Sequence, residues 1–231
     1  MTCFFFTKYP LEFPKFEVPL QIFFTKQQNN MKIALFSAVA EEAGAWAPRF
    51  NFTGIGRENA TRSIIDFVTR HQGEDYTIVN VGTVGSHSFP VGTILSIDEI
   101  VSAGSFFNNF RMLPTHFALP PELDVPHAVL YSSDSFVAPE VYTQDHLAAM
   151  KKQSQCFDME SSALISVAES YGIPYVSFKI VSDNLDITID IWRERVVELA
   201  KKMDGYLEKM IASMGDVEVI TGDKKGIVNR V

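Results

Sequence analysis

The fold is indicated by two neighbouring stretches, Cys156-Phe157-Asp158-Met159-Glu160-Ser161-Ser162-Ala163 and Tyr175-Val176-Ser177-Phe178-Lys179-Ile180-Val181-Ser182-Asp183-Asn184. Apolar residues at helical spacing predict a helix over 161–171, and a β-rich run predicts a strand over 175–181. Ligands in open α/β sheets bind beyond the carboxyl ends of parallel strands, so Glu160 and Asp183 are candidates to face one crevice. The alternative is that Glu160 is a charge at a helix N-terminus and Asp183 is a loop cap.

The rest of the chain alternates between strand-like and helix-like segments. Strands are expected over 31–38, 50–55, 76–81, 93–101 and 128–132, a short helical turn over 43–46, and helices over 58–69, from Pro139 to about 150, and over 187–212. Such alternation predicts an α/β fold. We expect a single-domain, three-layer sandwich whose central mixed, mainly parallel sheet is flanked by helices.

Composition limits the function. The 231 residues, 46% of them hydrophobic, suffice for one domain with a sizeable core. A formal net charge of −8 argues against nucleic acid as the main partner. The two cysteines, Cys3 and Cys156, lie far apart in the sequence, which fits a reducing compartment and predicts a cytoplasmic location.

The ends of the chain differ from its middle. Residues 1–30 are rich in Phe and interrupted by Pro, and their apolar runs are too short for a membrane span or a secretory signal. We expect residues 1–30 to be an extension outside the fold, residues 31–214 to be the catalytic domain, and residues 215–231 to be a mobile polar tail. The alternative for 1–30 is an arm that packs its aromatic side chains on a partner subunit.

Four ordered motifs resemble the nucleoside phosphorylase and nucleosidase superfamily. These are Met31-Lys32-Ile33-Ala34-Leu35-Phe36-Ser37-Ala38-Val39-Ala40-Glu41-Glu42, Val79-Asn80-Val81-Gly82-Thr83-Val84-Gly85-Ser86, F-D-M-E-S-S-A at 157–163 and I-V-S-D-N at 180–184. Together they look most like the 5'-methylthioadenosine/S-adenosylhomocysteine nucleosidase branch, over residues 31 to about 210. The resemblance implies hydrolysis of a purine nucleoside to free base and ribose moiety, a role in methionine salvage, and a homodimer.

The resemblance also implies roles for individual residues. Glu42 would activate water, Met159 and Glu160 would contact the ribose, and Ser182 and Asp183 would contact the purine. The segment Ser132-Ser133-Asp134-Ser135-Phe136-Val137 resembles the one that contacts the base, so Phe136 and Val137 are candidate stacking residues. Its alternative is a strand end with a core Phe.

Two glycine-rich segments are expected to be loops near the sugar. Gly54-Ile55-Gly56 lacks the third glycine of a dinucleotide fingerprint and predicts a tight turn. The segment 81–86 contains the candidate sugar contact Thr83, and no arginine lies near it in the sequence. Arginine forks are the usual means of holding phosphate, so their absence from this segment favours water as the nucleophile. Arg57, in the neighbouring segment, leaves phosphate open.

No cofactor or metal is expected. The five histidines, His71, His87, His116, His127 and His146, have no metal-ligand spacing. The proposed chemistry is dissociative: Asp183 protonates the purine N7, Glu160 binds the ribose hydroxyls, and water captures the anomeric carbon with help from Glu42. Cys156 is expected to be a small core residue.

One segment departs from the branch. Residues 101–110 keep aromatic residues, Phe106, Phe107 and Phe110, but lack the His-Asp pair found there in similar nucleosidases. The pocket for the 5'-substituent is therefore undecided, and futalosine is an alternative substrate. A phosphate-dependent phosphorylase and a catalytically silent nucleoside-binding scaffold are the alternative functions.

Overall fold

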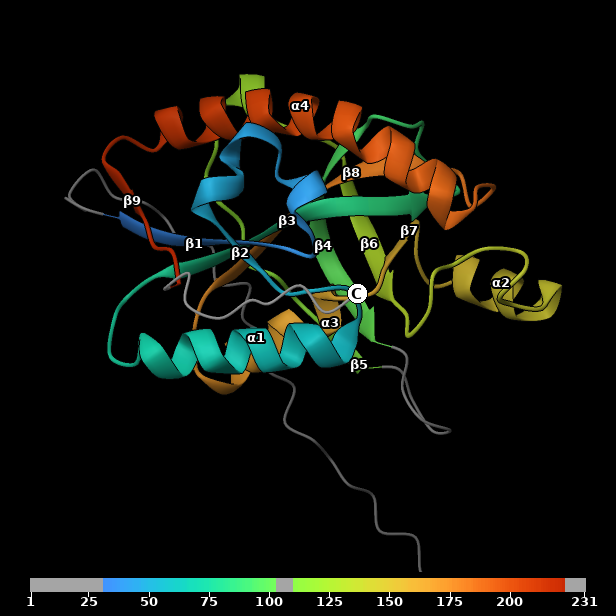
Figure 1. The fold of residues 1–231 in the computed structure, drawn as a ribbon, viewed down its shortest axis with the longest axis horizontal. Coiled ribbons are helices and arrows are strands. Elements are labelled where there is room, and N and C mark those ends of the chain that lie inside the picture. The colour runs from blue at the N-terminus through green and yellow to red at the C-terminus, as the bar shows by residue number, and fades with distance from the viewer. Residues whose placement is uncertain (1–30, 103–109, 223–231) are drawn as a thin grey trace, which may run out of the picture.

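A computed structural model describes residues 31–102 and 110–222 of the chain. They form one nine-stranded mixed sheet with helices on both faces (Figure 1). The strands are β1 (Met31–Ser37), β2 (Phe50–Phe52), β3 (Thr77–Ser86), β4 (Ile94–Ser102), β5 (Phe110–Met112), β6 (His127–Ser132), β7 (Cys156–Asp158), β8 (Tyr175–Asp183) and β9 (Val217–Val219). Six of the nine strand pairings described are parallel, so the expected α/β class is confirmed.

Helices cover the two faces of the sheet. The helices are α1 (Arg57–Arg70), α2 (Gln144–Lys151), α3 (Ser161–Ser170) and α4 (Ile189–Ser213), with short 3-10 turns η1 (Ala40–Glu42), η2 (Gly44–Arg49) and η3 (Pro121–Leu123). In Figure 1, α4 lies along one side of the sheet, α1 and α3 lie along the other, and α2 projects beyond one end.

The alternation of side chains along β1 explains why both faces are covered. Ala34 and Phe36 pack in the cluster that contains the buried side chains of α1 and α3. Ile33 and Leu35 point the other way and pack with Met203 and Leu207 of α4 and their neighbours. A strand with apolar residues on both faces has to be buried on both, which is the pattern of a sheet between two helical layers.

The order of the strands brings distant segments together. The sheet runs β2-β1-β3-β7-β6-β4-β5, and β8 pairs with both β3 and β4. As a result β3, β7, β6, β4 and β8 form a closed ring of pairings. Gly85 of β3 lies opposite Asp183 of β8 and also opposite Phe157 of β7. The two sequence stretches that indicated the fold therefore meet at the end of β3.

Several expectations need correction. The segment 81–86 is not a loop, because β3 continues through it to Ser86 and pairs with β8. The helix expected from Pro139 begins only at Gln144, where the Thr143 hydroxyl accepts a hydrogen bond from the His146 amide, and residues 139–142 form a turn. The second strand stops at Phe52. Strands β5 and β7 were not expected.

The two ends of the chain bear on the expected domain limits. Residues 217–219 form β9, which pairs in parallel with β1, so the sheet continues past residue 214. Residues 1–30, 103–109 and 223–231 lie outside the described residues, and with them the expectations for the Phe-rich extension and for Phe106 and Phe107.

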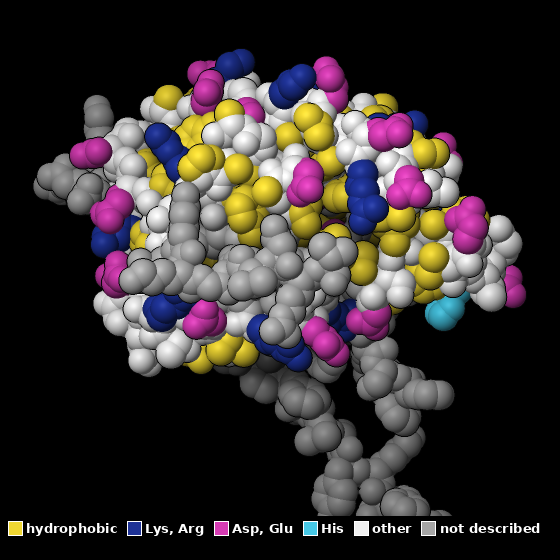
Figure 2. Space-filling model, in the orientation of Figure 1, with side chains coloured by type: hydrophobic (Ala, Val, Ile, Leu, Met, Phe, Trp, Pro, Cys, Tyr) yellow, Lys and Arg dark blue, Asp and Glu magenta, His cyan; other side chains and the backbone are white. Residues whose placement is uncertain are grey.

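Charge on the surface is mixed. On the face shown in Figure 2, Lys and Arg side chains lie among Asp and Glu side chains, as expected for a chain with a modest negative net charge. Among residues 31–102 and 110–222, no helix has the length and apolar character needed to cross a membrane.

Candidate active site

Glu42 is held rigidly at the end of the first 3-10 turn. Its Oε2 accepts hydrogen bonds from Ser37 Oγ at 2.9 Å and from the Ala38 amide at 3.3 Å, and its Oε1 accepts from the amide and the hydroxyl of Thr83 at 2.8 and 2.7 Å. The side chain is only 7% exposed. Four donors fix the position of this buried side chain and satisfy the hydrogen-bonding capacity of its two oxygens.

Helix α4 supports this carboxylate from behind. Trp192 Nε1 donates to Thr83 Oγ1 at 2.9 Å, and the same hydroxyl donates to Glu42. Trp192 packs with Ile187 and Val196, and the partly buried Val39 and Phe136 lie against them. Thr83, expected to contact the sugar, is therefore engaged by Glu42 and Trp192. The sequence analysis gave no role to Trp192.

Glu160 lies just before α3 and contacts the glycine turn. Its Oε1 accepts a hydrogen bond from the Gly56 amide at 2.7 Å. Gly54 and Gly56 have φ angles of +78° and +89°, which confirms the tight turn and explains the glycines. Burial raises the pKa of Glu160 to about 8, and the neighbouring charges of Asp158 and Glu42 act in the same direction, while the Gly56 amide lowers it.

A buried ion pair underlies the carboxylates. Lys179 Nζ lies 3.1 Å from Asp158 Oδ2, and the two side chains are 3% and 2% exposed. Burial alone would lower the pKa of Lys179, but Asp158, Tyr175, Glu42 and Glu160 hold it above its usual value. Asp158 also accepts hydrogen bonds from the amide and hydroxyl of Ser161. The sequence analysis missed this pair, although a lysine inside a fully buried strand requires a buried partner.

Asp183 ends β8 beneath a small cavity. It accepts hydrogen bonds from Ser182 Oγ at 2.7 Å and from the Leu185 amide at 2.9 Å. Burial raises the pKa of Asp183, although these two hydrogen bonds lower it. Ser182 is itself buried and bonded to Asp183, so it lies behind the carboxylate rather than in the cavity.

The turn after Asp183 is strained. Leu185 has a φ of +64°, a backbone conformation that residues with a Cβ rarely adopt and that is often found at functional sites. Gly85 makes room for it, because a Cβ there would lie 2.6 Å from Leu185 Cδ2 and 3.0 Å from Asp183 Oδ1. Gly85 is therefore required by the close approach of β3 to this turn.

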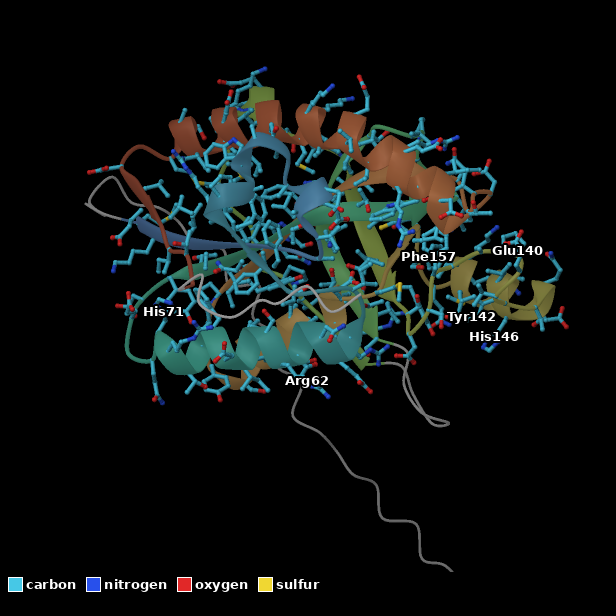
Figure 3. The ribbon with its side chains drawn as sticks, viewed as in Figure 1. Arg62, His71, Glu140, Tyr142, His146 and Phe157 are labelled. Atoms are coloured by element: carbon cyan, nitrogen blue, oxygen red, sulfur yellow. The ribbon has the colours of Figure 1, made fainter. Side chains whose placement is uncertain are left out.

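The cavity brings together four of the eight expected site residues, Phe136, Val137, Met159 and Asp183, whereas Glu42, Thr83, Glu160 and Ser182 do not line it. It has a volume of about 30 Å³ and is lined by Gly85, Ser133, Phe136, Val137, Phe157, Asp158, Met159, Asp183 and Leu185. Phe157, in β7, shares an apolar cluster with Leu147 and Met150 of α2 (Figure 3). A space of about 30 Å³ is small for a purine base, so a base would enter only if the lining side chains moved aside.

The guanidinium group of Arg57 is engaged by neighbouring residues through its NH2 nitrogen. Its NH2 nitrogen is 3.0 Å from Asp134 Oδ1 and donates to the Ser132 carbonyl at 3.3 Å. Its Nε is buried without a partner. Cys156 is a fully buried core residue, as expected, and burial raises the pKa of its thiol.

A family model and solved structures are similar to this chain. Residues 115–212 match the model of the phosphorylase superfamily, a range that includes Met159, Glu160 and Asp183 but not Glu42 or Thr83. No curated protein matches the chain by sequence. The solved structure of a 5'-methylthioadenosine/S-adenosylhomocysteine nucleosidase from S. pneumoniae, with a transition-state inhibitor, aligns with a TM-score of 0.66 and 16% identity, covering 80% of this chain and 100% of that one.

Two further structures are similar to the same extent. A futalosine hydrolase mutant from Helicobacter pylori aligns with a TM-score of 0.63 and 13% identity over 79% of this chain and 99% of that one. The 5'-methylthioadenosine nucleosidase of Arabidopsis thaliana, in apo form, aligns with a TM-score of 0.63 and 16% identity over 82% and 98%. Residues 115–212 are thus similar to the phosphorylase superfamily, and the chain as a whole shares the fold of the solved nucleosidase structures.

Proposed function

We propose that this protein hydrolyses the N-glycosidic bond of a purine nucleoside, releasing the free base and the ribose moiety. The observation that carries the proposal is the clamp on Glu42, whose carboxyl group is buried and held by Ser37, Ala38 and Thr83. A protein that only bound nucleosides would have no use for a fixed carboxylate of this kind, whereas a hydrolase uses one to orient and deprotonate water.

The other two carboxylates suit the remaining steps. Asp183 lines the cavity, and burial raises its pKa, which favours the protonated form that can donate to the purine N7. Glu160 is fixed by the Gly56 amide through one oxygen, leaving the other for the ribose hydroxyls. Met159 and Phe136 line the cavity as apolar walls for the sugar and base, and Val137 completes the base side.

The reaction balances without a cofactor. As the bond between N9 and C1' breaks, its electron pair moves to the base, and the proton of Asp183 goes to N7. Water forms the new bond to C1' and gives its proton to Glu42. Positive charge builds up on the ribose in between, and Glu160 would bind the 2'- and 3'-hydroxyls as a carboxylate, a form that the Gly56 amide favours and that burial disfavours.

Water is favoured over phosphate as the nucleophile. No arginine lines the cavity within the described residues, and Arg57 is engaged by Asp134 and the Ser132 carbonyl. Binding of phosphate by the NH2 nitrogen of Arg57 would compete with these two contacts. A phosphorylase is therefore less well supported than a hydrolase.

A silent binding scaffold is the second candidate, and two observations favour it. The four donors around Glu42 already fill its acceptor positions, so a water can bind only by displacing one of them. The Ser37 and Thr83 hydroxyls are the donors that can rotate away. In addition, the cavity of about 30 Å³ has to enlarge before a base can bind.

The substrate class rests on the relatives. The similar structures include nucleosidases for 5'-methylthioadenosine and S-adenosylhomocysteine, and a futalosine hydrolase. We propose 5'-methylthioadenosine or S-adenosylhomocysteine as substrate, with futalosine as the alternative. We also propose a cytoplasmic homodimer with a role in methionine salvage.

The test is release of free base from five nucleosides with and without phosphate. Purified protein is incubated with methylthioadenosine, adenosylhomocysteine, futalosine, inosine and adenosine, and the products are separated by chromatography. Free base with an unphosphorylated sugar supports the hydrolase. Strict phosphate dependence with a sugar 1-phosphate product supports the phosphorylase, and nucleoside binding without turnover supports the scaffold.

A further inference from the structure

Three side chains that are far apart in the sequence meet on the surface of the sheet. Asp98 comes from β4, His116 from the segment between β5 and β6, and His127 from the first residue of β6. Asp98 Oδ1 lies 3.4 Å from His116 Nε2 and 2.5 Å from His127 Nδ1. One donor atom from each residue falls within 4.8 Å of the others. The spacing of His116 and His127 in the sequence gave no sign of this arrangement, which the fold alone creates.

Each imidazole has a polar neighbour near its other ring nitrogen. The second nitrogen of His116, Nδ1, is 3.4 Å from Ser96 Oγ. The second nitrogen of His127, Nε2, is 3.8 Å from Asp124 Oδ1. Metal-binding histidines have this arrangement, in which one ring nitrogen faces the ion and the other faces a hydroxyl, carbonyl or carboxylate that fixes the ring.

The backbone at Asp98 is irregular in a way that aims its side chain. The pairing of β4 with β6 shifts register between Ile97 and Glu99, so Asp98 has no partner across the pair. An extra residue of this kind bends the strand and redirects its side chain, and such bulges are common at functional sites. Here the redirected carboxylate lies between the two imidazoles.

We propose that Asp98, His116 and His127 form a binding site for a divalent transition metal of the zinc class. Two imidazoles and a carboxylate are a donor set that suits zinc, with the fourth position open to solvent because all three side chains are partly exposed. In a tetrahedral zinc site, donor atoms lie about 3.3 Å apart, which follows from bonds of about 2.0 to 2.1 Å. The 3.4 Å between His116 Nε2 and Asp98 Oδ1 already matches this spacing. His127 Nδ1, at 2.5 Å, has to move away from Asp98 Oδ1 by under about 1 Å.

The site is structural rather than catalytic. His127 begins β6, whereas Ser132, next to the candidate active site, ends the same strand. The three residues therefore lie at the opposite end of β6 from the cavity. A bound ion would join the segment between β5 and β6 to the sheet, since His116 belongs to that segment and the other two ligands belong to strands.

The experiment measures metal binding by the whole chain without a histidine tag, after treatment with a chelator. Zinc is titrated by calorimetry, and cobalt is used as a spectroscopic substitute because its visible absorption reports four-coordinate geometry. The variants are His116→Ala, His127→Ala and Asp98→Asn, the last of which keeps the size of the side chain. His146→Ala is the matched control, because His146 lies beside Tyr142 on the outer edge of the molecule (Figure 3).

We expect one zinc per chain, a cobalt spectrum of four-coordinate type, and binding at least about 10-fold weaker in each of the three variants, in line with the loss of one ligand. His146→Ala should bind as the unaltered chain does. Circular dichroism separates loss of the site from loss of folding, and Asp98→Asn is the variant least able to disturb the fold. Zinc binding that is absent, or equal in Asp98→Asn and the unaltered protein, overturns the proposal and leaves the three residues as a hydrogen-bonded cluster.

Discussion

Lys179 and Asp158 form an ion pair in the interior of the protein, with 3.1 Å between Nζ and Oδ2 and 3% and 2% of their side chains exposed. The lysine lies four residues before Asp183 on β8, and its charge reaches Glu42 and Glu160 as well. A single buried cation thus balances several carboxylates beneath the candidate active site. Without it, these negative charges would repel one another in an environment that screens them poorly.

Replacement of this cation is expected to destabilise the fold. Lys179→Met leaves the buried Asp158 without a partner, and breaking a buried ion pair from one side costs about 3–5 kcal/mol. The free energy of unfolding in urea measures the loss. Lys201→Met, in an exposed pair with Glu198, should change it by less than about 1 kcal/mol. A loss at Lys179 as small as that of the control would show that the pair does not stabilise the protein.

Asp183→Asn should remove the proton donor while keeping the size and shape of the side chain. An asparagine can still hydrogen-bond to N7 but cannot give up a proton, so we expect kcat to fall about 100-fold or more while KM changes less. Steady-state kinetics of base release provide the measurement. Asp145→Asn, at an exposed residue of α2 away from the cavity, is the control. Turnover by Asp183→Asn near the unaltered rate would contradict the assigned role.

Glu160→Gln should affect binding as well as turnover. In the proposed mechanism Glu160 accepts hydrogen bonds from ribose hydroxyls in both the ground state and the transition state, so KM should rise and kcat should fall together. A 2'-deoxy substrate has one hydroxyl fewer and should lose less from the substitution than the riboside. Equal losses for the two substrates would place Glu160 away from the 2'-hydroxyl.

The raised pKa of Glu160 also predicts how stability varies with pH. The folded protein holds this proton up to about pH 8, whereas an unfolded glutamate releases it near pH 4.5. Between these values the folded state binds more protons, so the contribution is fully present below pH 4.5 and is lost as the pH rises towards 8. In urea unfolding from pH 5 to 8.5, the free energy of unfolding should fall less steeply with pH for Glu160→Gln than for the unaltered chain.

The matched control for this pH series is Glu58→Gln, because Glu58 is an exposed glutamate on α1. Its stability should follow that of the unaltered chain at every pH. If Glu160→Gln also follows the unaltered chain, the carboxyl of Glu160 is not the group that releases its proton between pH 4.5 and 8.

Glu42→Gln should give a protein that binds substrate but hardly turns it over. The amide oxygen can keep two of the four hydrogen bonds, but the NH2 group faces two donors and cannot take a proton from water. We expect kcat to fall about 100-fold or more, with nucleoside binding retained in calorimetry. Glu41→Gln, at the exposed adjacent residue, should be fully active. If Glu42→Gln and Asp183→Asn both remain active, the silent scaffold is excluded but so is the mechanism.

The sequence by itself determined the fold class and most of the elements. The helical spacing after Ser161 and the β-rich run from Tyr175 predicted α3 and β8 to within two residues, because both are long enough for their periodicity to be clear. It also determined which carboxylates to examine, since Glu42, Glu160 and Asp183 stand at element ends where polar side chains reach ligands. Strands of three residues, such as β5, β7 and β9, carry too little periodicity to be found in this way.

Only the tertiary structure decided which groups hold these carboxylates. Thr83 reaches Glu42, and Lys179 reaches Asp158, because the pairing of β3 with β8 places their strands side by side. Trp192, on α4, reaches Thr83, which lies 109 positions earlier in the sequence. The cluster of Asp98, His116 and His127 likewise depends on a shift of register in one strand pair. Local sequence sets periodicity, whereas contacts of this kind depend on how strands are ordered in the sheet, which no short pattern encodes.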